Sequence, residues 1–151
     1  KISKITHSHH EGMCGAESVA WTIFMLRKGS SFEEIKHHAY ENWEYYLDYD
    51  LEAVHKETEG AFTTCAWTTV PLALFIGLKA KSVDDALRKC IYLGGDVDSM
   101  AAIACSIAEL IHGKIDQNIM RKVYSANVKR YNDVLLVIER FNLNFVYRKG
   151  S

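Results

Sequence analysis

Apolar side chains along this chain recur every three to four residues rather than every second residue. That spacing places them on one face of a helix, so the sequence predicts an all-α protein. Few residues interrupt the pattern, because the chain contains a single proline, Pro71, and 9 glycines. No internal repeat or Pro/Gly/Ser-rich linker is visible, and we expect residues 1–151 to form a single domain.

The first two predicted helices are marked by the residues at their ends. Residues 16–27 carry an apolar stripe, and Gly29 follows as a stop signal. Ser31 and Glu34 form a capping-box pattern, which begins a second helix that extends into residues 43–50. Those last residues mix aromatic and acidic side chains. They form either a partner surface or, as amphipathicity favours, a core-facing aromatic stripe beside a solvated acidic face.

The centre of the predicted domain lies in the middle of the chain. Residues 52–60 are polar and predict a loop or a frayed helix. Residues 63–79 are apolar nearly all round, which predicts a buried helix. Pro71 either kinks this helix or occupies the first turn of its second part.

Four more helices are predicted in the remaining part of the chain. Each begins or ends at a recognisable signal or carries an amphipathic pattern. They are a helix that begins at the Ser82–Asp85 capping pair and ends at Leu93, a helix over 98–112 that is rich in small residues and closed by Gly113, and amphipathic helices over about 116–124 and 128–141.

Composition and charge exclude several classes of partner. The 18 basic and 19 acidic side chains give a net charge of -1, so no basic surface for nucleic-acid polymers is expected. No apolar run approaches the roughly 20 residues that span a membrane, and no signal peptide begins the sequence. The 4 cysteines show no C-x-x-C spacing. We therefore expect reduced, buried thiols and a cytoplasmic protein.

The residues best suited to metal binding or catalysis are Asp96, Asp98 and Ser99, which follow Gly94 and Gly95. Two carboxylates separated by one residue, in a loop made tight by glycines, can turn their oxygens toward one hard cation such as Mg²⁺ or Ca²⁺. Zinc is not expected, because no histidine or cysteine lies at ligand spacing. Taken alone, so short a motif favours a simple alternative: Asp98 or Ser99 caps the next helix and Asp96 stabilises the turn.

Three segments carry further information through their order along the chain. They are Thr6-His7-Ser8-His9-His10-Glu11, Val70-Pro71-Leu72-Ala73-Leu74-Phe75 and Leu93-Gly94-Gly95-Asp96-Val97-Asp98-Ser99. In the same order they resemble the Thr-His-x-His-Pro-Glu segment, the Val/Leu-Pro-x-Ala-Leu/Ile-Tyr helix and the Leu-Gly-Gly-Asp-Thr-Asp-Thr metal motif of the ADP-ribosylglycohydrolase family, which includes the dinitrogenase-reductase-activating glycohydrolases. The resemblance covers about residues 5–113 and leaves 114–151 as additional C-terminal helices.

This resemblance implies an orthogonal multi-helix bundle that holds two Mg²⁺ ions. It implies that Asp96 and Asp98 are catalytic carboxylates and metal ligands, together with the hydroxyl of Ser99. It also implies that His7, Gly94 and Gly95 lie at the bound ADP-ribose. The expected activity is magnesium-dependent hydrolysis of N- or O-glycosidic linkages of ADP-ribose, with an ADP-ribosylated protein or a small ADP-ribose conjugate as substrate.

One departure from the family pattern changes this expectation. The N-terminal Thr-Asp-Asp and Gly-Asp-x-x-Gly motifs do not occur, and the sequence begins at Lys1 rather than at a methionine. We therefore expect an incomplete bundle that carries half of the site and is inactive or nearly so alone. The missing half would have been lost, or would be supplied by another chain or by a homodimer. The alternative is a non-catalytic scaffold or binding relative, similar to the lens crystallins that resemble this family.

Overall fold

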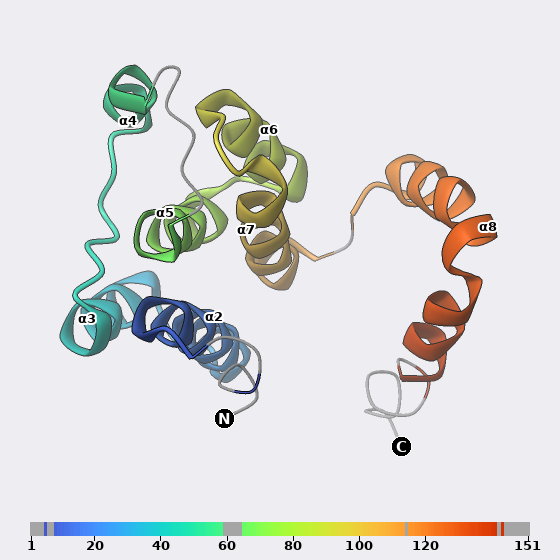
Figure 1. Cartoon of the computed structure of the whole chain (residues 1–151), viewed down its shortest axis with the longest axis horizontal. Helices are drawn as coiled ribbons and strands as arrows, with labels where there is room; N and C mark the ends of the chain where they lie inside the picture. Colours follow the sequence, from blue (N-terminus) through green and yellow to red (C-terminus); the bar gives the residue numbers. More distant parts are fainter. Residues whose placement is uncertain (1–4, 6–7, 59–64, 114, 142, 144–151) are drawn as a thin grey trace. The chain divides into compact units, whose positions relative to one another are not determined.

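In a computed structural model the chain is helical, and its described residues, 5, 8–58, 65–113, 115–141 and 143, contain no strand (Figure 1). The predicted all-α class is confirmed. The helices are α2 (His10–Lys28), α3 (Phe32–Trp43), α4 (Leu51–Thr58), α5 (Ala66–Lys79), α6 (Val83–Leu93), α7 (Val97–His112) and α8 (Gln117–Phe141). The chain divides into two compact units, Lys1–Lys114 and Ile115–Ser151, and each is described by itself.

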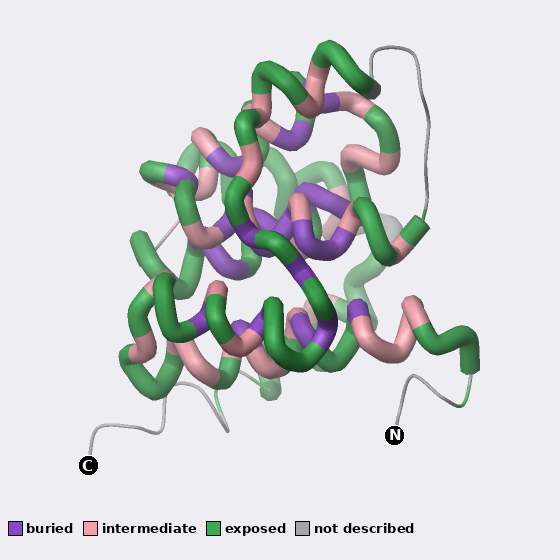
Figure 2. Tube along the Cα trace, turned by 90° about the vertical axis from the view of Figure 1, so that its left-hand side faces the viewer, coloured by how far each residue is buried: buried purple, intermediate pink, exposed green. Residues whose placement is uncertain are grey.

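Helix α5 is the central helix of the first unit and packs against both α7 and α2 (Figure 1). Its residues Leu74 and Ile76 are fully buried, and Figure 2 shows buried positions gathered in the middle of this unit. At Gly77, α5 and α7 approach each other very closely. A Cβ atom there would lie 2.7 Å from the carbonyl oxygen of Ala104 and 2.8 Å from the Cβ of Ile107. The small residues of α5 and α7 thus permit the close contact that holds the unit together.

The ends of α2 and α3 follow local chemistry. Gly29 ends α2 with a φ of 86°, in the left-handed region that glycine adopts without strain. Both hydrogen bonds of the predicted capping box between Ser31 and Glu34 are present at the start of α3. These two predictions are confirmed. Helix α2, however, begins at His10, six residues before the predicted start.

The segment after α3 corrects the sequence analysis. Helix α3 ends at Trp43, and residues 44–50 are not helical. Burial there alternates: Tyr45 and Leu47 are buried, whereas Tyr46 is 66% exposed. This two-residue period is that of an extended chain, so the predicted helix over this segment is wrong. Trp43 and Tyr45 face the core beside exposed acidic residues, as the interpretation requires, but Tyr46 does not.

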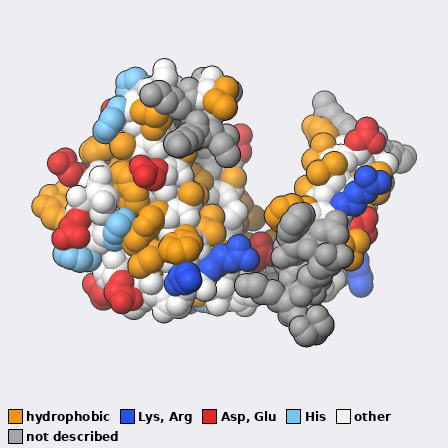
Figure 3. All heavy atoms as spheres, turned by 90° about the horizontal axis from the view of Figure 1, so that it is seen from below, with side chains coloured by type: hydrophobic (Ala, Val, Ile, Leu, Met, Phe, Trp, Pro, Cys, Tyr) orange, Lys and Arg blue, Asp and Glu red, His pale blue; other side chains and the backbone are white. Residues whose placement is uncertain are grey.

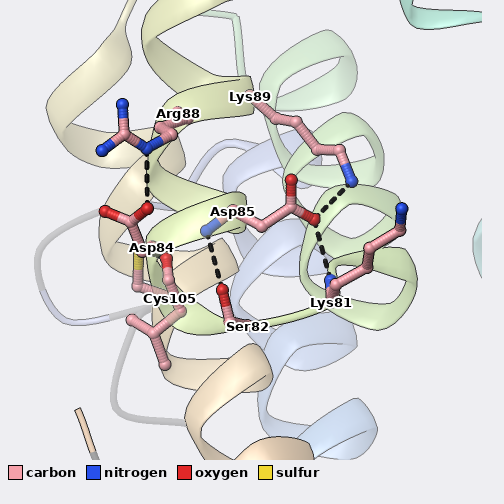
Figure 4. Close-up of polar contacts among 8 residues, drawn as sticks. Lys81, Ser82, Asp84, Asp85, Arg88, Lys89 and Cys105 are labelled. Atoms are coloured by element: carbon pink, nitrogen blue, oxygen red, sulfur yellow. Dashed lines mark hydrogen bonds and ion pairs between the residues drawn. The ribbon is translucent and has the colours of Figure 1, made fainter. Parts of the chain in front are cut away.

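The first turn of α6 is held by a small network of polar contacts (Figure 4). The Ser82 hydroxyl accepts a hydrogen bond from the Asp85 amide at 3.1 Å, as the capping pattern predicts. The Asp85 carboxylate accepts from the Lys81 amide at 2.8 Å and from the Lys89 ammonium at 2.7 Å. These contacts, first that of Lys89 and then that of the Lys81 amide, lower the pKa of Asp85. The ionised carboxylate therefore stabilises the start of α6.

The substitution Asp85→Asn should lower the free energy of unfolding by about 1 kcal/mol at pH 7, because it removes a partly buried ion pair. The native-state pKa is lowered, so the stabilisation is present above the ordinary pKa of an aspartate. It is lost as the pH falls through the lower native value. Urea unfolding of both proteins between pH 7 and pH ~2.5 should show the difference disappear. Asp84→Asn is the control, because its pair with Arg88 is more exposed and should contribute less.

The second unit contains α8, in which two helices, as predicted, follow one another across a break in the helical backbone. Its backbone leaves the helical region at Tyr131, with φ −130° and ψ 30°. The predicted gap at 125–127 is helical, so the predicted position of the break is wrong. Among the described residues, no helix combines the length and the apolar composition needed to cross a bilayer.

The four cysteines differ in burial. Cys90 is buried, and burial raises its pKa to about 12. Cys14 and Cys105 are partly buried, but Cys65 is exposed at the start of α5. The expectation of uniformly buried thiols is therefore wrong for Cys65, because a helix start places it at the surface of the unit.

Candidate functional site

A two-glycine loop connects α6 to α7 and positions the predicted carboxylates. Gly94 and Gly95 have φ values of 75° and 72°, which side-chain-bearing residues rarely adopt. The loop turns the chain within three residues and delivers Asp96 to the position just before α7. Asp98 follows in the first turn of α7. The backbone geometry of this loop thus explains why the motif contains two glycines.

The two carboxyl groups lie together at the start of α7. A hydrogen bond with the Asp96 side chain, and then one from the Ser99 amide at 3.1 Å, lower the pKa of Asp98. Asp96 occupies the capping position, yet its side chain makes no capping hydrogen bond. The simple alternative, in which Asp98 or Ser99 caps α7 and Asp96 stabilises the turn, differs from the structure in one point, because Asp96 itself occupies the capping position. Paired oxygens of this kind are suited to a hard cation.

A cavity of about 370 Å³ opens beside this loop, within the range of roughly 300–1,000 Å³ typical of small-molecule sites. Its wall contains the aromatic side chains of Tyr49 and Trp67. Its charged side chains are the carboxylates of Glu57 and Asp96, and no described basic side chain lines it. The cavity therefore offers flat apolar surfaces together with oxygen ligands. Such a lining suits a ligand that combines an aromatic ring with hydroxyl groups.

Two helix starts also border the cavity. Thr68 and Thr69 lie in the first turn of α5, and Gly95 and Asp96 immediately precede α7. Neither helix has a side-chain cap at its first residue. Amide groups at helix starts carry partial positive charge and favour phosphate oxygens. The Asp96 carboxylate at the start of α7 suits cations and hydroxyls, whereas the start of α5, which carries no carboxylate, suits anions.

The structure brings together some of the predicted site residues and not others. Gly94, Gly95 and Asp96 line the cavity. Asp98 and Ser99 are exposed in the adjacent first turn of α7 and do not belong to the cavity wall. His7 lies outside the described residues.

Sequence analysis missed several cavity residues. Tyr49 and Glu57 come from the segments interpreted as a helix tail and a loop, and Trp67 was treated as part of a buried helix. Burial raises the pKa of the Tyr49 hydroxyl. One signal was available: the run Trp67-Thr68-Thr69 directly precedes the recognised Val70-Pro71 pair. Nothing in the local pattern pointed to Glu57.

The donor set fits a divalent cation in kind but not in number. Carboxylate and hydroxyl oxygens are the ligands that Mg²⁺ and Ca²⁺ prefer, and Asp96, Asp98 and Ser99 supply them. Within the part of the chain that the structure describes, however, no three His, Cys, Asp or Glu side chains lie close enough together to hold a metal ion. Octahedral Mg²⁺ takes six oxygen ligands, so these residues provide only part of a coordination shell.

Comparison with known proteins identifies the family of the chain. The sequence matches the family model described as ADP-ribosylglycohydrolase over residues 1–143, which extends beyond the three recognised motifs into α8. No curated protein and no solved structure gave a match. The family match covers most of the 151 residues. The chain belongs to the ADP-ribosylglycohydrolase family.

Proposed function

We propose that this chain forms the ADP-ribose-binding side of a magnesium-dependent hydrolase that cleaves N- or O-glycosidic linkages of ADP-ribose. The observation that carries this proposal is the position of Asp96, which lines the cavity at the start of α7, with Asp98 in the first turn of the same helix. Membership of the family gives the general activity, the removal of ADP-ribose. The cavity adds a reason for binding, because its aromatic walls and helix starts match the adenine ring and the diphosphate.

The roles of the residues follow from the chemistry of the linkage. Cleavage at the anomeric carbon of ribose develops positive charge on the sugar, which nearby carboxylates stabilise. Asp96 and Asp98 would hold the cation through their carboxylates and Ser99 through its hydroxyl. A bound Mg²⁺ supplies charge for the ribose hydroxyls and for an attacking water. Either aspartate can accept a proton from that water. The apolar wall of the cavity excludes bulk water from the bond that breaks.

A binding function without hydrolysis is the second candidate. The observation that favours it is that the described residues supply only part of a donor set, which on its own would hold a divalent cation weakly. On this view ADP-ribose enters the cavity, but the linkage is not cleaved unless further ligands are supplied. The two candidates share the binding step and differ in turnover.

Calorimetric titration of ADP-ribose into the chain tests the shared step. We expect tighter binding in MgCl₂ than in EDTA, and a loss of at least about tenfold in affinity for Asp98→Asn in MgCl₂, because that substitution removes a charge at the cation. In EDTA the affinities of the variant and the wild type for ADP-ribose should differ much less. Asp84→Asn, also in the first turn of a helix but remote from the motif, should bind like the wild type.

Hydrolysis is then measured separately, with ADP-ribosylated arginine and ADP-ribosylated serine peptides as substrates. Binding without release of ADP-ribose supports the second candidate. Release that is abolished by Asp98→Asn supports the first. Equal affinity of wild type and Asp98→Asn in the presence of Mg²⁺ would show that Asp98 has no part in a cation site and would overturn both forms of the metal proposal.

A further inference from the structure

The cavity beside Asp96 is poor in positive charge for a site that would hold a diphosphate. None of its described lining residues is Lys, Arg or His. On the face of the first unit that Figure 3 shows, acidic side chains are likewise scattered, whereas the basic ones gather in one place. A phosphate oxygen that leaves water needs hydrogen-bond donors, which must then be hydroxyl, indole or backbone N–H groups. The described wall has four side chains with such a donor: Tyr49, Trp67, Thr68 and Thr69.

Among these donors, the hydroxyl of Tyr49 is both unused and the most acidic. The Thr68 hydroxyl already donates to the carbonyl oxygen of Cys65 at 3.1 Å. The Tyr49 hydroxyl makes no hydrogen bond with a described residue. It also differs from the Tyr45 hydroxyl and the His55 Nδ1, which are the described side-chain polar atoms buried without a partner. It is therefore accessible, and a phenol O–H is a stronger donor to an anion than an alcohol or an indole N–H.

The position of Tyr49 is fixed by contacts on both sides of it along the chain. Its ring packs edge-on against the ring of Phe75 in α5, with a centroid distance of 5.4 Å and an interplanar angle of 65°. Two residues earlier, Leu47 is fully buried. The next residue, Asp50, accepts a hydrogen bond from the Glu52 amide at 3.0 Å and so holds the start of α4. The hydroxyl is thus held in place before a ligand arrives, which lowers the entropic cost of binding.

We propose that Tyr49 is a ligand-binding residue whose hydroxyl donates a hydrogen bond to a phosphate oxygen of the ADP-ribose diphosphate. This inference rests on the proposed function and names the group that binds the anionic part of the ligand. Burial raises the pKa of Tyr49, so the hydroxyl stays protonated and remains a donor at neutral pH. Trp67 is then the aromatic surface available to the adenine ring.

Calorimetric titration of the full chain and of Tyr49→Phe tests the proposal. The variant keeps the ring that packs against Phe75 and removes only the hydroxyl, so its urea unfolding should match that of the wild type. We expect the affinity for ADP-ribose to fall about tenfold in both MgCl₂ and EDTA, because the hydroxyl does not act through the cation. Adenosine, which lacks the diphosphate, should not distinguish the two proteins. Tyr46→Phe is the matched control, since Tyr46 lies in the same segment outside the cavity wall, and it should bind ADP-ribose like the wild type.

The outcomes distinguish this inference from the proposed function. Equal affinity of the wild type and Tyr49→Phe for ADP-ribose would overturn the role of Tyr49 and leave the proposed function in place. An equal loss of affinity for ADP-ribose and adenosine would move the hydroxyl to the nucleoside, and a loss confined to MgCl₂ would move it to the cation; either result overturns the contact with the diphosphate. If the wild type binds ADP-ribose neither in MgCl₂ nor in EDTA, the proposed function fails and this inference fails with it.

Discussion

Gly77→Ala is expected to lower the free energy of unfolding of the first unit by about 2 kcal/mol, although alanine is the better helix former. Gly77 lies in α5 where this helix meets α7. An added methyl group would lie 2.7 Å from the Ala104 carbonyl oxygen and 2.8 Å from the Ile107 Cβ. Both atoms belong to backbone or to a rigid branched side chain, so the helices must separate. Overpacking typically costs about 1–3 kcal/mol, which outweighs the helix gain of up to ~1 kcal/mol.

Gly12→Ala is the matched control for this substitution. Gly12 also lies in a helix, α2, and nothing stands within 4 Å of the position of an added Cβ. At Gly12 only the higher helix propensity of alanine acts, so the variant should be as stable as the wild type or slightly more stable. Guanidinium unfolding followed by circular dichroism measures all three proteins. Equal midpoints for the two variants would mean that α5 and α7 do not approach as closely as the structure places them.

The sequence allowed the helices to be located where local chemistry determines them. The capping box at Ser31, the serine cap at Ser82 and the stop at Gly29 each depend on residues within one helical turn. Such signals act before tertiary packing, and for this reason the predicted ends agree with the structure. The all-α class followed from the same local periodicity.

Elements that depend on distant contacts were not predicted. Residues 44–50 are extended because Tyr45 and Leu47 are buried against other helices, and Tyr45 contacts the ring of Trp67 at a centroid distance of 5.4 Å. A local pattern of aromatic and acidic residues does not contain that information. The weak polar pattern at residues 52–60 left a loop and a frayed helix open, and the structure contains α4 there, a helix of 8 residues whose packing against α6 supplies what its own sequence lacks.

In the candidate site, too, some residues could be identified from the local sequence and others only from the fold. Gly94, Gly95 and Asp96 were predicted because their chemistry is contiguous in sequence, and all three line the cavity. Tyr49, Glu57 and Trp67 reach the same cavity from segments far from the motif. Only the tertiary structure brings them together, and of the three only Trp67, close to the recognised Val70-Pro71 pair, had a signal in the sequence. The motif thus marks one wall of the cavity and leaves the opposite walls to the fold.

Gly94→Ala is expected to have two effects, a loss of stability and a loss of ADP-ribose binding. Gly94 has φ 75° and ψ −154°, a region that essentially only glycine occupies. An alanine there costs about 1–3 kcal/mol of strain, and the loop relieves this strain by changing its conformation. Because the loop carries Asp96 to the cavity, the affinity for ADP-ribose should fall by at least about tenfold in MgCl₂. Calorimetric titration and urea unfolding measure the two effects on the same protein.

Gly113→Ala is the control that distinguishes the effect of backbone strain from the loss of ADP-ribose binding. Gly113 ends α7 with φ 82° and ψ −149°, almost the same conformation as Gly94, and neither position has an atom within 4 Å of an added Cβ. The two variants should therefore lose similar stability. Gly113 does not line the cavity, so its variant should bind ADP-ribose like the wild type at temperatures where both are folded. If both variants lose affinity equally, the effect of Gly94→Ala is a consequence of general destabilisation. If neither loses affinity, the loop does not position Asp96 for the ligand.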